Sequence, residues 1–538
     1  MMRFLIIPVF ALFLTLYANA QRDTTKDLDA VDIVTRYNPV LNDARKVESQ
    51  PELKEPETKD IKFTYTFPDL RYKVSPAFTP ISAQQYRTKS ESSEEGNFVK
   101  VGFGNYTTPL VHLELHNVKS SNYAYGLSFR HLSSKGKPEF KSFMDDNLSI
   151  HGAKYLNGNT ISGKLGYTRN AYNFYGYNHE EHTFKRDSVR QVLNNVTANI
   201  HYDNSKTSFP LKTFFDGDIN RFSTTTQNEI GYRLGNKTGA KLGNGDIYLN
   251  TAFEGFVSGP DSLKYNRNFV DINPVYKMRY MNVDLTLGAN ASIFLDSLET
   301  KFYLFPEFRI DYYLVPDKMK AFAGLGGGLV KGSTRALYTE NQFLDGNQPL
   351  RNQITPYVIF AGIKGKLGSG FDYILELSQR SITDLPLFVN DTNALRKFKV
   401  LYDKVGLFKF QAGLNYSKGD KFIIGTNFSY YTYSTNTAHA YQRPDFEWDT
   451  KVGTTINKNL ALHADLYVIG TRYAYNIGAF ESIKQTPIAD INIGADYRYT
   501  KYLTIFANLN NLTNQTYQRW FNYPSYGFNG VAGVTFVF

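Results

Sequence analysis

The sequence predicts an all-β protein, a transmembrane antiparallel β-barrel of about 16–22 strands that follows an extended N-terminal periplasmic segment. Three observations support this fold class. Apolar and polar residues alternate over runs as long as a membrane-crossing strand. The chain has 40 Tyr, 41 Phe and 40 Gly, yet its mean hydropathy is −0.38. Its first residues have the pattern of an export signal.

The amino terminus predicts export. Arg3 precedes an uncharged apolar run from Phe4 to Tyr17, and Ala18-Asn19-Ala20 follows as a small-x-small cleavage site. The run is shorter than the roughly 20 apolar residues of a permanent helical anchor. We therefore expect residues 1–20 to be a signal peptide, with Gln21 as the first mature residue. The chain contains no cysteine, which excludes a lipoprotein, disulfides and thiolate metal sites.

Residues 21–96 have a different composition from the rest of the chain. They contain no glycine before Gly96, and prolines recur from Pro39 to Pro80. Prolines at this density interrupt helices and central strands, so we predict an extended periplasmic segment. It is either a tether without structure of its own or an arm that binds a periplasmic or lipoprotein partner. The apolar residues that would bind such a partner are Val31, Ile33, Val34, Phe63, Tyr65 and Phe67.

Residues 97–538 have the period of two that is typical of strands. The alternation is cleanest in residues 282–293, 408–417 and 490–499. Each of these runs is about ten residues long, which suffices for a tilted strand to cross the hydrocarbon core. Strands of soluble proteins average only about five or six residues. Noisier runs occur at residues 161–168, 308–314, 460–468 and 503–509.

Turn sequences separate these runs. Short turns are predicted at residues 156–159, 417–420 and 456–459 because of their Asn, Gly and Asp residues. Longer irregular stretches are predicted to be loops on the outer side of the membrane. They are residues 177–186, 258–267, 333–354, 381–397, 435–447 and 473–487. Tyrosines near the ends of runs are predicted to form aromatic girdles at the headgroup level, namely Tyr172, Tyr175, Tyr177, Tyr430, Tyr431 and Tyr433.

The formal net charge of +10 does not indicate a nucleic-acid partner in an exported chain, because the Lys and Arg residues are scattered. Contact with anionic lipid headgroups, an anion-preferring lumen and ordinary surface charge remain open. The alternation places Lys164, Arg309, Lys409 and Arg498 on the lumen face, where they would tune ion selectivity or simply form a hydrated wall.

The carboxyl end has a recognisable pattern. The chain ends in an alternating strand in which Val534, Phe536 and Phe538 share a face. Residues 502–517 contain the sequence Asn-Asn-Leu-Thr-Asn, and residues 523–528 supply a loop with Pro and Gly. These features resemble the last two strands of TonB-dependent receptors. The resemblance implies an outer-membrane barrel of a Gram-negative cell, with the three terminal residues as an assembly signal for the outer-membrane insertion machinery.

The amino-terminal part departs from that family. Receptors of the family carry a larger, glycine-rich plug domain before the barrel, and residues 21–96 leave no room for one. We therefore expect a shortened, plugless relative of the kind found in Bacteroidetes-type envelopes.

No residue is predicted to be catalytic, to bind a cofactor or to bind a metal, and the chain is not expected to be an enzyme. His179-Glu180-Glu181-His182 lacks the helical spacing of a zinc site and lies in a predicted loop. Gly368-Ser369-Gly370 is a turn, not a nucleophile elbow. Asp391 and Asn393 carry suitable oxygens for calcium, but no twelve-residue ligand loop surrounds them.

Two functions remain. The first is a pore or transporter for small solutes, open or gated by a partner. The alternative is a non-transport structural or assembly component whose arm, residues 21–96, docks a periplasmic or lipoprotein partner. The lumen distinguishes them: a transporter keeps a polar path, whereas a scaffold can fill its barrel with loops, aromatic side chains or its own tail.

Overall fold

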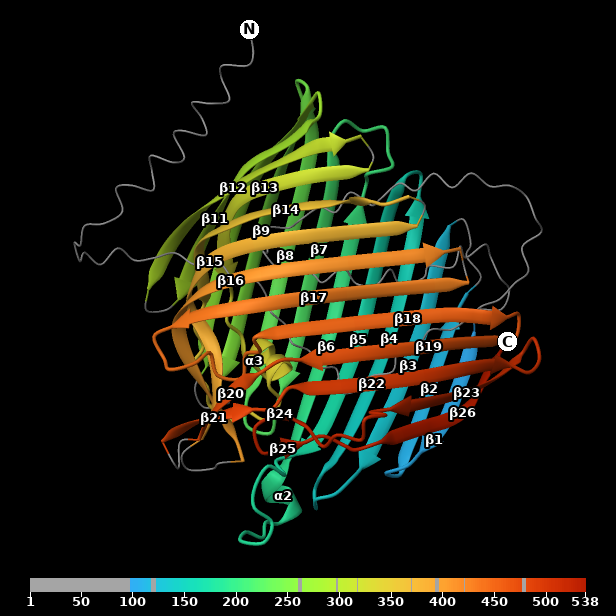
Figure 1. Ribbon diagram of the computed structural model, residues 1–538. Coiled ribbons are helices and arrows are strands. Elements are labelled where there is room, and N and C mark those ends of the chain that lie inside the picture. The colour runs from blue at the N-terminus through green and yellow to red at the C-terminus, as the bar shows by residue number, and fades with distance from the viewer. Residues whose placement is uncertain are drawn as a thin grey trace. The chain divides into compact units, whose positions relative to one another are not determined.

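The computed structural model confirms the all-β prediction: a 22-stranded antiparallel sheet closes into a barrel (Figure 1). It describes residues 97–117, 122–259, 264–296, 299–316, 318–368, 370–391, 396–419, 421–476 and 480–538. Among these residues, no helix is both long and apolar enough to span a bilayer.

The barrel strands follow one another around the ring in chain order. Their bounds are β1 Phe98–Gly104, β2 Thr108–His116, β3 Tyr123–Lys135, β4 Ser142–Leu156, β5 Asn159–Asn173, β6 Arg190–Asp203, β7 Lys212–Ser223, β8 Asn228–Leu242, β9 Gly245–Gly259, β10 Tyr265–Tyr280, β11 Val283–Asp296, β12 Thr300–Val315, β13 Met319–Val330, β14 Gln353–Lys366, β15 Phe371–Asn390, β16 Phe398–Lys418, β17 Phe422–Thr435, β18 Phe446–Asn457, β19 Leu460–Ile469, β22 Ile488–Arg498, β23 Leu503–Asn510 and β26 Asn529–Val537.

Short elements lie between these strands. They are the helices α2 Arg186–Val189 and α3 Thr334–Glu340, and two small hairpins made of β20 Arg472–Asn476 with β21 Glu481–Gln485 and β24 Gln518–Trp520 with β25 Tyr523–Pro524.

The first and last strands close the ring. In the β1–β26 pair, Phe98 lies opposite Val537 and Gly104 lies opposite Val531. Gly533 of β26 faces this seam, where a Cβ atom would overlap the backbone of β1 at Val101. Closure removes the unpaired edges that an open sheet would expose.

Alternation along each strand separates an apolar outer face from a polar inner face. On β16, Phe408 is exposed on the outer face, whereas Gln411 of the inner face is 3 % exposed. On β22, Ile491 and Ile493 are exposed outward and Asp490 is buried on the inner side. The alternation read from the sequence therefore assigned these faces correctly.

The two ends of the barrel differ in the length of their connections. The end that holds Phe98 and Val537, here the terminal rim, has short turns such as 157–158, 243–244 and 458–459. The opposite end, here the distal rim, holds the long connections 174–189, 331–352, 470–487 and 511–528. This asymmetry is typical of outer-membrane barrels, whose periplasmic turns are short and whose extracellular loops are long.

Three predicted loops were too long or of the wrong type. Strands β9 and β10 extend into the predicted loop 258–267, and β15 continues to Asn390 within the predicted loop 381–397. The predicted loop 473–487 contains the β20–β21 hairpin. In the first two cases a barrel strand continues farther than the sequence pattern indicated, and in the third the loop forms a separate two-stranded hairpin.

The prediction of aromatic girdles was partly wrong. Tyr430 is exposed on the outer face of β17, as predicted. Tyr172 and Tyr431 are instead buried among other aromatic side chains inside the barrel, and Tyr175 and Tyr433 pack against the same clusters. The sequence periodicity did not reveal this because an aromatic residue suits a lipid interface and a protein core equally well.

Candidate functional site

The inner wall of the barrel and the loops at its distal rim form the candidate functional site. The strand register assigns the wall, since each inner residue lies beside inner residues of both neighbouring strands. Lys164, Arg309, Lys409 and Arg498 all lie on this inner face, opposite His151, Gly324, Ser378 and Thr504 in turn. The predicted lumen positions of these four cations are therefore correct.

Acidic and basic side chains pair along the inner wall. The Arg309 Nε donates to Asp311 at 2.6 Å, and the Lys364 Nζ lies 3.5 Å from the same carboxylate. On β8 and β7, a few strands away along the same wall, Arg233 forms an ion pair with Asp216. These paired positions suit a hydrated solute. Elsewhere on the inner face, Phe256, Phe269, Phe294, Tyr303 and Phe305 of β9–β12 form an aromatic cluster.

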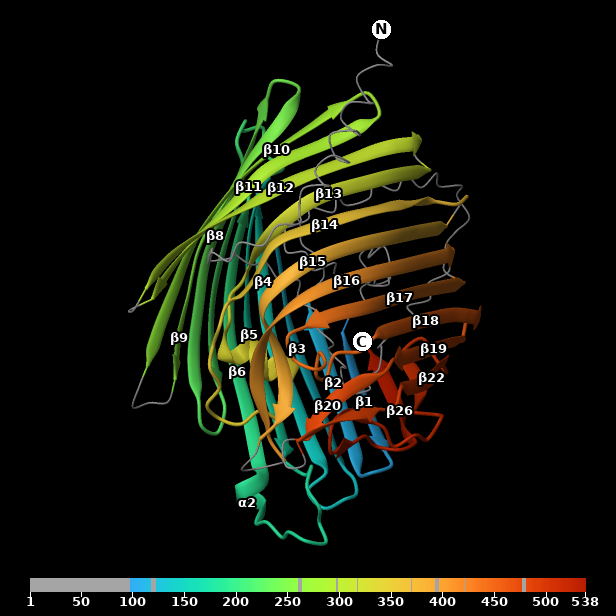
Figure 2. The same ribbon diagram turned by 60° about the vertical axis from the view of Figure 1, so that its left-hand side comes forward.

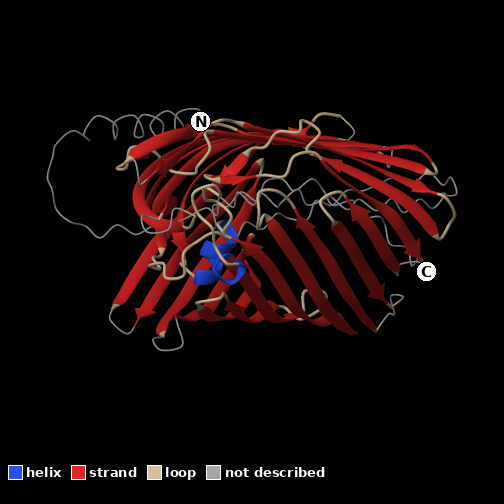
Figure 3. Cartoon of the chain, turned by 90° about the horizontal axis from the view of Figure 1, so that it is seen from below, coloured by secondary structure: helices blue, strands red, loops and turns tan. Residues whose placement is uncertain are grey.

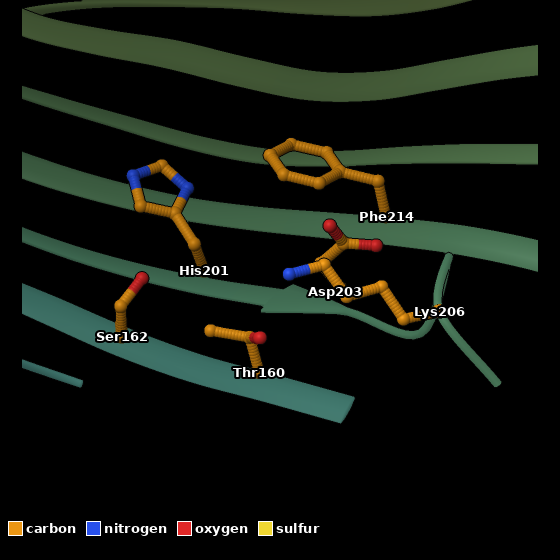
Figure 4. A pocket seen from close by; sticks show the side chains of 6 residues that line it. All are labelled: Thr160, Ser162, His201, Asp203, Lys206 and Phe214. Atoms are coloured by element: carbon orange, nitrogen blue, oxygen red, sulfur yellow. The ribbon is translucent and has the colours of Figure 1, made fainter. Parts of the chain in front are cut away.

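A recess of about 300 Å³ opens in this wall near the terminal rim. Its lining residues come from β5, β6, β7 and the turn after β6 (Figure 4): Thr160, Ser162, His201, Asp203, Lys206 and Phe214. The rings of His201 and Phe214 are stacked, with 5.9 Å between their centroids. The recess therefore presents hydroxyl, imidazole, carboxylate and ammonium groups beside one aromatic face.

Loops bridge the distal mouth of the barrel. Residues from opposite walls and from three long connections share one hydrophobic core, here called the distal bridge. Its buried residues are Tyr172, Phe174, Val189, Leu193, Phe222, Leu337, Tyr338, Phe343, Leu344, Phe388, Phe398, Val400, Trp520 and Tyr523. Figure 3 looks along the barrel from the α2 end, with helices and loops inside the outline of the strands.

Phe343 is central to the distal bridge. It lies in the connection 331–352, and its ring stacks on Tyr523 of the connection 511–528 with 3.6 Å between centroids. Its other face contacts Tyr172 of β5, edge to face at 5.4 Å. Trp520 packs edge to face on Phe388 and Phe398 of β15 and β16. Aromatic pairs of this kind contribute about 0.5–1.5 kcal/mol each beyond the area they bury.

The connection 331–352 is fixed to the wall at its start. Glu229 of β8 is fully buried, and its carboxylate accepts hydrogen bonds from the backbone N–H groups of Thr334 and Arg335 at 2.6 and 3.1 Å. The hydroxyl of Ser258 donates to the same carboxylate at 2.8 Å. Three donors thus compensate the cost of burying this charge.

Two cations tie the same connection to β9 and β10. Lys331 pairs with Glu254 at 2.8 Å and with Asp271 at 2.5 Å. Arg267 donates to the carbonyl oxygen of Gly332 at 2.7 Å and to the side-chain oxygen of Asn352. Both ends of the connection are therefore held at one part of the wall.

Further pairs tie the middle of this connection to the far wall. Lys397 donates to Asp345 at 2.7 Å. Burial alone would raise the pKa of Asp345, but the hydrogen bonds from Lys397 and from the backbone of Gly346 lower it below its ordinary value. The Arg443 guanidinium pairs with Glu340 at 2.5 Å and donates to the carbonyl oxygen of Pro386.

The connection 511–528 completes the distal bridge. The Lys141 Nζ donates to the carbonyl oxygen of Ser525 at 2.6 Å and lies over the ring of Tyr526. Burial lowers the pKa of the Lys141 ammonium to about 8. The Tyr523 hydroxyl donates to the carbonyl oxygen of Arg396, and burial raises the pKa of this phenol well above its ordinary value.

The predicted candidates for metal and catalytic chemistry lie apart from this core. His182, Glu180 and Glu181 are exposed at the tip of the connection 174–189, and the His179 ring stacks on Tyr177. Asp391 pairs with Lys399 at 2.8 Å, whereas Asn393 and Ser369 lie outside the described residues. Within the described ranges, no group of three or more His, Asp or Glu side chains is arranged to hold a metal ion.

Of the predicted assembly and partner residues, the structure describes only those for assembly. Val534, Phe536 and Phe538 all have exposed side chains, and the alternation of β26 directs them to the outer face. The six predicted arm residues, Val31, Ile33, Val34, Phe63, Tyr65 and Phe67, lie outside the described residues.

Sequence reasoning did not find the distal bridge. A usable signal was present, because the connections 174–189 and 511–528 carry Phe174, Tyr175, Phe184, Trp520 and Tyr523. Solvated loops rarely concentrate large aromatic side chains, whereas cores do.

The barrel is similar to those of solved outer-membrane transport proteins. The ferric-catecholate import receptor Fiu of E. coli K12 matches over 82 % of this chain and 81 % of its own, with a TM-score of 0.63 and 9 % identity. The FrpB iron transporter of Neisseria meningitidis matches over 82 % and 81 %, with a TM-score of 0.64 and 11 % identity. The siderophore receptor PiuA of Acinetobacter baumannii matches over 82 % of each chain, with a TM-score of 0.61 and 9 % identity.

These likenesses establish the fold, and they confirm the predicted resemblance to the barrel of TonB-dependent receptors. No protein-family model matches the sequence, and no curated protein matches it.

Proposed function

We propose that this chain is an outer-membrane barrel that transports small solutes and is gated at its distal mouth by its own loops. The observation that carries this proposal is a closed 22-stranded barrel whose inner wall carries paired acidic and basic side chains. Proteins with the same barrel fold include an iron transporter and siderophore receptors.

The outer membrane is the compartment that fits this barrel best. Its outer face carries apolar side chains such as Leu165, Leu287 and Phe302, which are exposed and would contact lipid hydrocarbon. The terminal rim then faces the periplasm, together with residues 21–96, and the distal bridge faces the cell exterior. We assign no catalytic role.

The distal bridge is the proposed gate. Its aromatic core joins β5 to β16, and these strands lie half-way round the ring from each other. A path for solutes through the distal mouth therefore requires these side chains to separate. A solute or partner that binds the open arrangement more tightly would shift the population toward it.

Two further roles belong to this proposal. Val534, Phe536 and Phe538 on the closing strand are the assembly signal that the insertion machinery binds, consistent with their exposure on one face. In residues 21–96, Val31 to Val34 and Phe63 to Phe67 supply the apolar side chains for a periplasmic or lipoprotein partner.

A structural or assembly role is the second candidate, and the distal bridge also favours it. A barrel whose mouth is crossed by a packed aromatic core resembles an anchor as much as a pore. In that case residues 21–96 would perform the function by docking the partner.

Conductance in planar bilayers separates the two candidates. The purified chain is measured with and without residues 21–95. Stable, rare openings of the intact chain support gated transport, and openings that appear only after truncation assign the closing role to the amino-terminal segment. Silence of both proteins, with the barrel shown to be folded by heat-modifiable migration, contradicts transport and favours the anchor.

A further inference from the structure

Charged side chains on the outer face of the barrel gather on one sector. On β9–β12, the outward positions from Ile247 to Leu314 carry no charged side chain. On β3–β7 the outward positions differ. They carry Lys135, Lys154, Arg169, Arg190 and Arg221, with Asp146 as the carboxylate and His131 beside it.

On these strands, the outer face changes from apolar to polar toward the distal rim. On β5, Leu165 and Tyr167 are exposed outward, and the next outward residue is Arg169. On β7, the exposed Ile219 is followed by Arg221. Apart from Lys154, which lies toward the terminal rim, the charges therefore begin where the apolar belt ends on the distal side. This is the level of lipid headgroups in a membrane-spanning barrel.

One acid is already neutralised within the sector. Asp146 accepts from the His131 Nδ1 at 2.6 Å and lies 3.4 Å from the Arg169 guanidinium. Asp146 lies directly opposite His131 on β3 and Arg169 on β5 in the strand register. This pairing accounts for one of the arginines and leaves the others without a local counter-ion.

Arg190 and Arg221 are the unpaired cations. Both side chains are exposed, and neither has an acidic partner within the part of the chain that the structure describes. They lie on adjacent strands but not side by side: Arg221 is opposite Val196, which lies six residues along β6 from Arg190, or about 20 Å at 3.3 Å per residue. Lys185 and Arg186, also exposed, precede them in the distal connection.

We propose that the distal outer face of β5–β7, centred on Arg190 and Arg221, binds the phosphate groups of an anionic membrane lipid. Guanidinium groups bind phosphate through two parallel hydrogen bonds, and their fixed charge is not lost at any physiological pH. The apolar belt directly below, with Leu165, Ile219 and Tyr167, supplies a surface for the acyl chains of the same lipid. A phosphate-bearing headgroup with its acyl chains is thus complementary to both halves of this face. The inference rests on the proposed outer-membrane location but not on transport.

The test uses the full chain in a neutral detergent. Diphosphoryl lipid A is titrated against the parent, with the same lipid lacking both phosphates as one arm and competing inorganic phosphate as another. The double variant Arg190→Gln, Arg221→Gln is compared with Lys404→Gln, which removes an exposed cation from the distal part of β16. A shift in electrophoretic migration on heating shows that each variant forms a folded barrel. The single variants Arg190→Gln and Arg221→Gln are measured as well, in case the double variant does not fold.

Each arginine near an anionic headgroup contributes about a fivefold change in affinity. We expect the double variant to bind diphosphoryl lipid A roughly 25-fold more weakly than the parent, and the Lys404 variant to bind within about twofold of it. Removal of the phosphates should weaken binding to the parent and leave the double variant unchanged.

Equal affinity of the parent and the double variant would overturn the proposal. Binding that does not depend on the lipid phosphates would also overturn it. Full competition by inorganic phosphate would show that the arginines bind free anions and not a lipid headgroup. A variant that loses solute conductance but still binds the lipid with the affinity of the parent would contradict the lipid proposal, because the arginines would then not contribute to lipid binding.

Discussion

The ring of Phe343 contacts the ring of Tyr172 edge to face, with 5.4 Å between their centroids. Tyr172 belongs to β5, whereas the backbone of Phe343 accepts a hydrogen bond from Phe398 at the start of β16. These two strands lie half-way round the 22-stranded ring from each other. A single residue therefore joins opposite walls, and the distal bridge is a crossing of the mouth and not a local packing of neighbouring loops.

The anchor of the connection 331–352 gives the first prediction. Glu229→Gln replaces a buried carboxylate oxygen by an N–H₂ group facing donors from Thr334, Arg335 and Ser258. The loss of these charge-assisted bonds should destabilise the docked connection by about 2 kcal/mol. Trypsin should then cleave after Arg335 more than tenfold faster than in the parent.

Glu181→Gln, at an exposed position of the connection 174–189, is the control and should leave this cleavage rate unchanged. An unchanged rate in the Glu229 variant would mean that the hydrophobic contacts alone hold the connection in place.

Lys141 makes the closure of the distal bridge dependent on pH. Its pKa is about 8 in the docked state and returns toward 10.5 when the connection 511–528 is released. Between these values the released state binds more protons than the docked state, so a rise of pH through this window should favour docking. Below pH 8 the effect should be constant.

The measurement uses Trp520, which is buried in the distal bridge, in a Trp448→Phe background that leaves it as the single tryptophan of the chain. Quenching by acrylamide should decrease from pH 8 to pH 10. Lys141→Met should abolish this change, because the titrating group is gone. The same decrease in the Lys141 variant would assign it to another group.

The seam between β1 and β26 gives a prediction about assembly. Gly533→Ala would place a Cβ atom against the backbone of β1 at Val101 and Gly102. Overpacking of this kind costs about 1–3 kcal/mol, so the yield of heat-modifiable barrel should fall. Gly453→Ala on β18 is the matched control, since an added Cβ there meets no atom within 4 Å. Equal yields of the two variants would show that the seam can adjust.

Much of the barrel could be predicted from the sequence because the face of each strand residue follows from its immediate neighbours in the chain. A strand with lipid on one side and polar groups on the other alternates at every residue, as on β11 and β22, so the faces of Leu287 and Ile493 followed from their neighbours. The observed 22 strands lie at the upper end of the predicted range. The range was wide because strands such as β15 and β16, the long ribbons of Figure 2, have ends that the sequence marks only weakly.

The distal bridge could not be predicted in the same way because its contacts join residues far apart in the chain. Phe343 and Tyr523 are stacked, yet neither belongs to a barrel strand and no periodicity surrounds them. The pairing of Lys141 with Ser525 likewise depends on the ring being closed. Aromatic residues in the connections were the available signal, and two of them, Tyr175 and Tyr177, were interpreted as girdle residues.

The most direct test of the gating account is the conductance of a variant with a weakened distal bridge. In Phe343→Ala, Trp520→Ala the two rings that join the walls are removed, whereas Tyr499→Ala removes an exposed ring near the terminal rim as a control. We predict that the double variant conducts for at least tenfold more of the time than the parent, and that the control matches the parent. A folded double variant that stays as silent as the parent would contradict a gated transport barrel and favour an anchor.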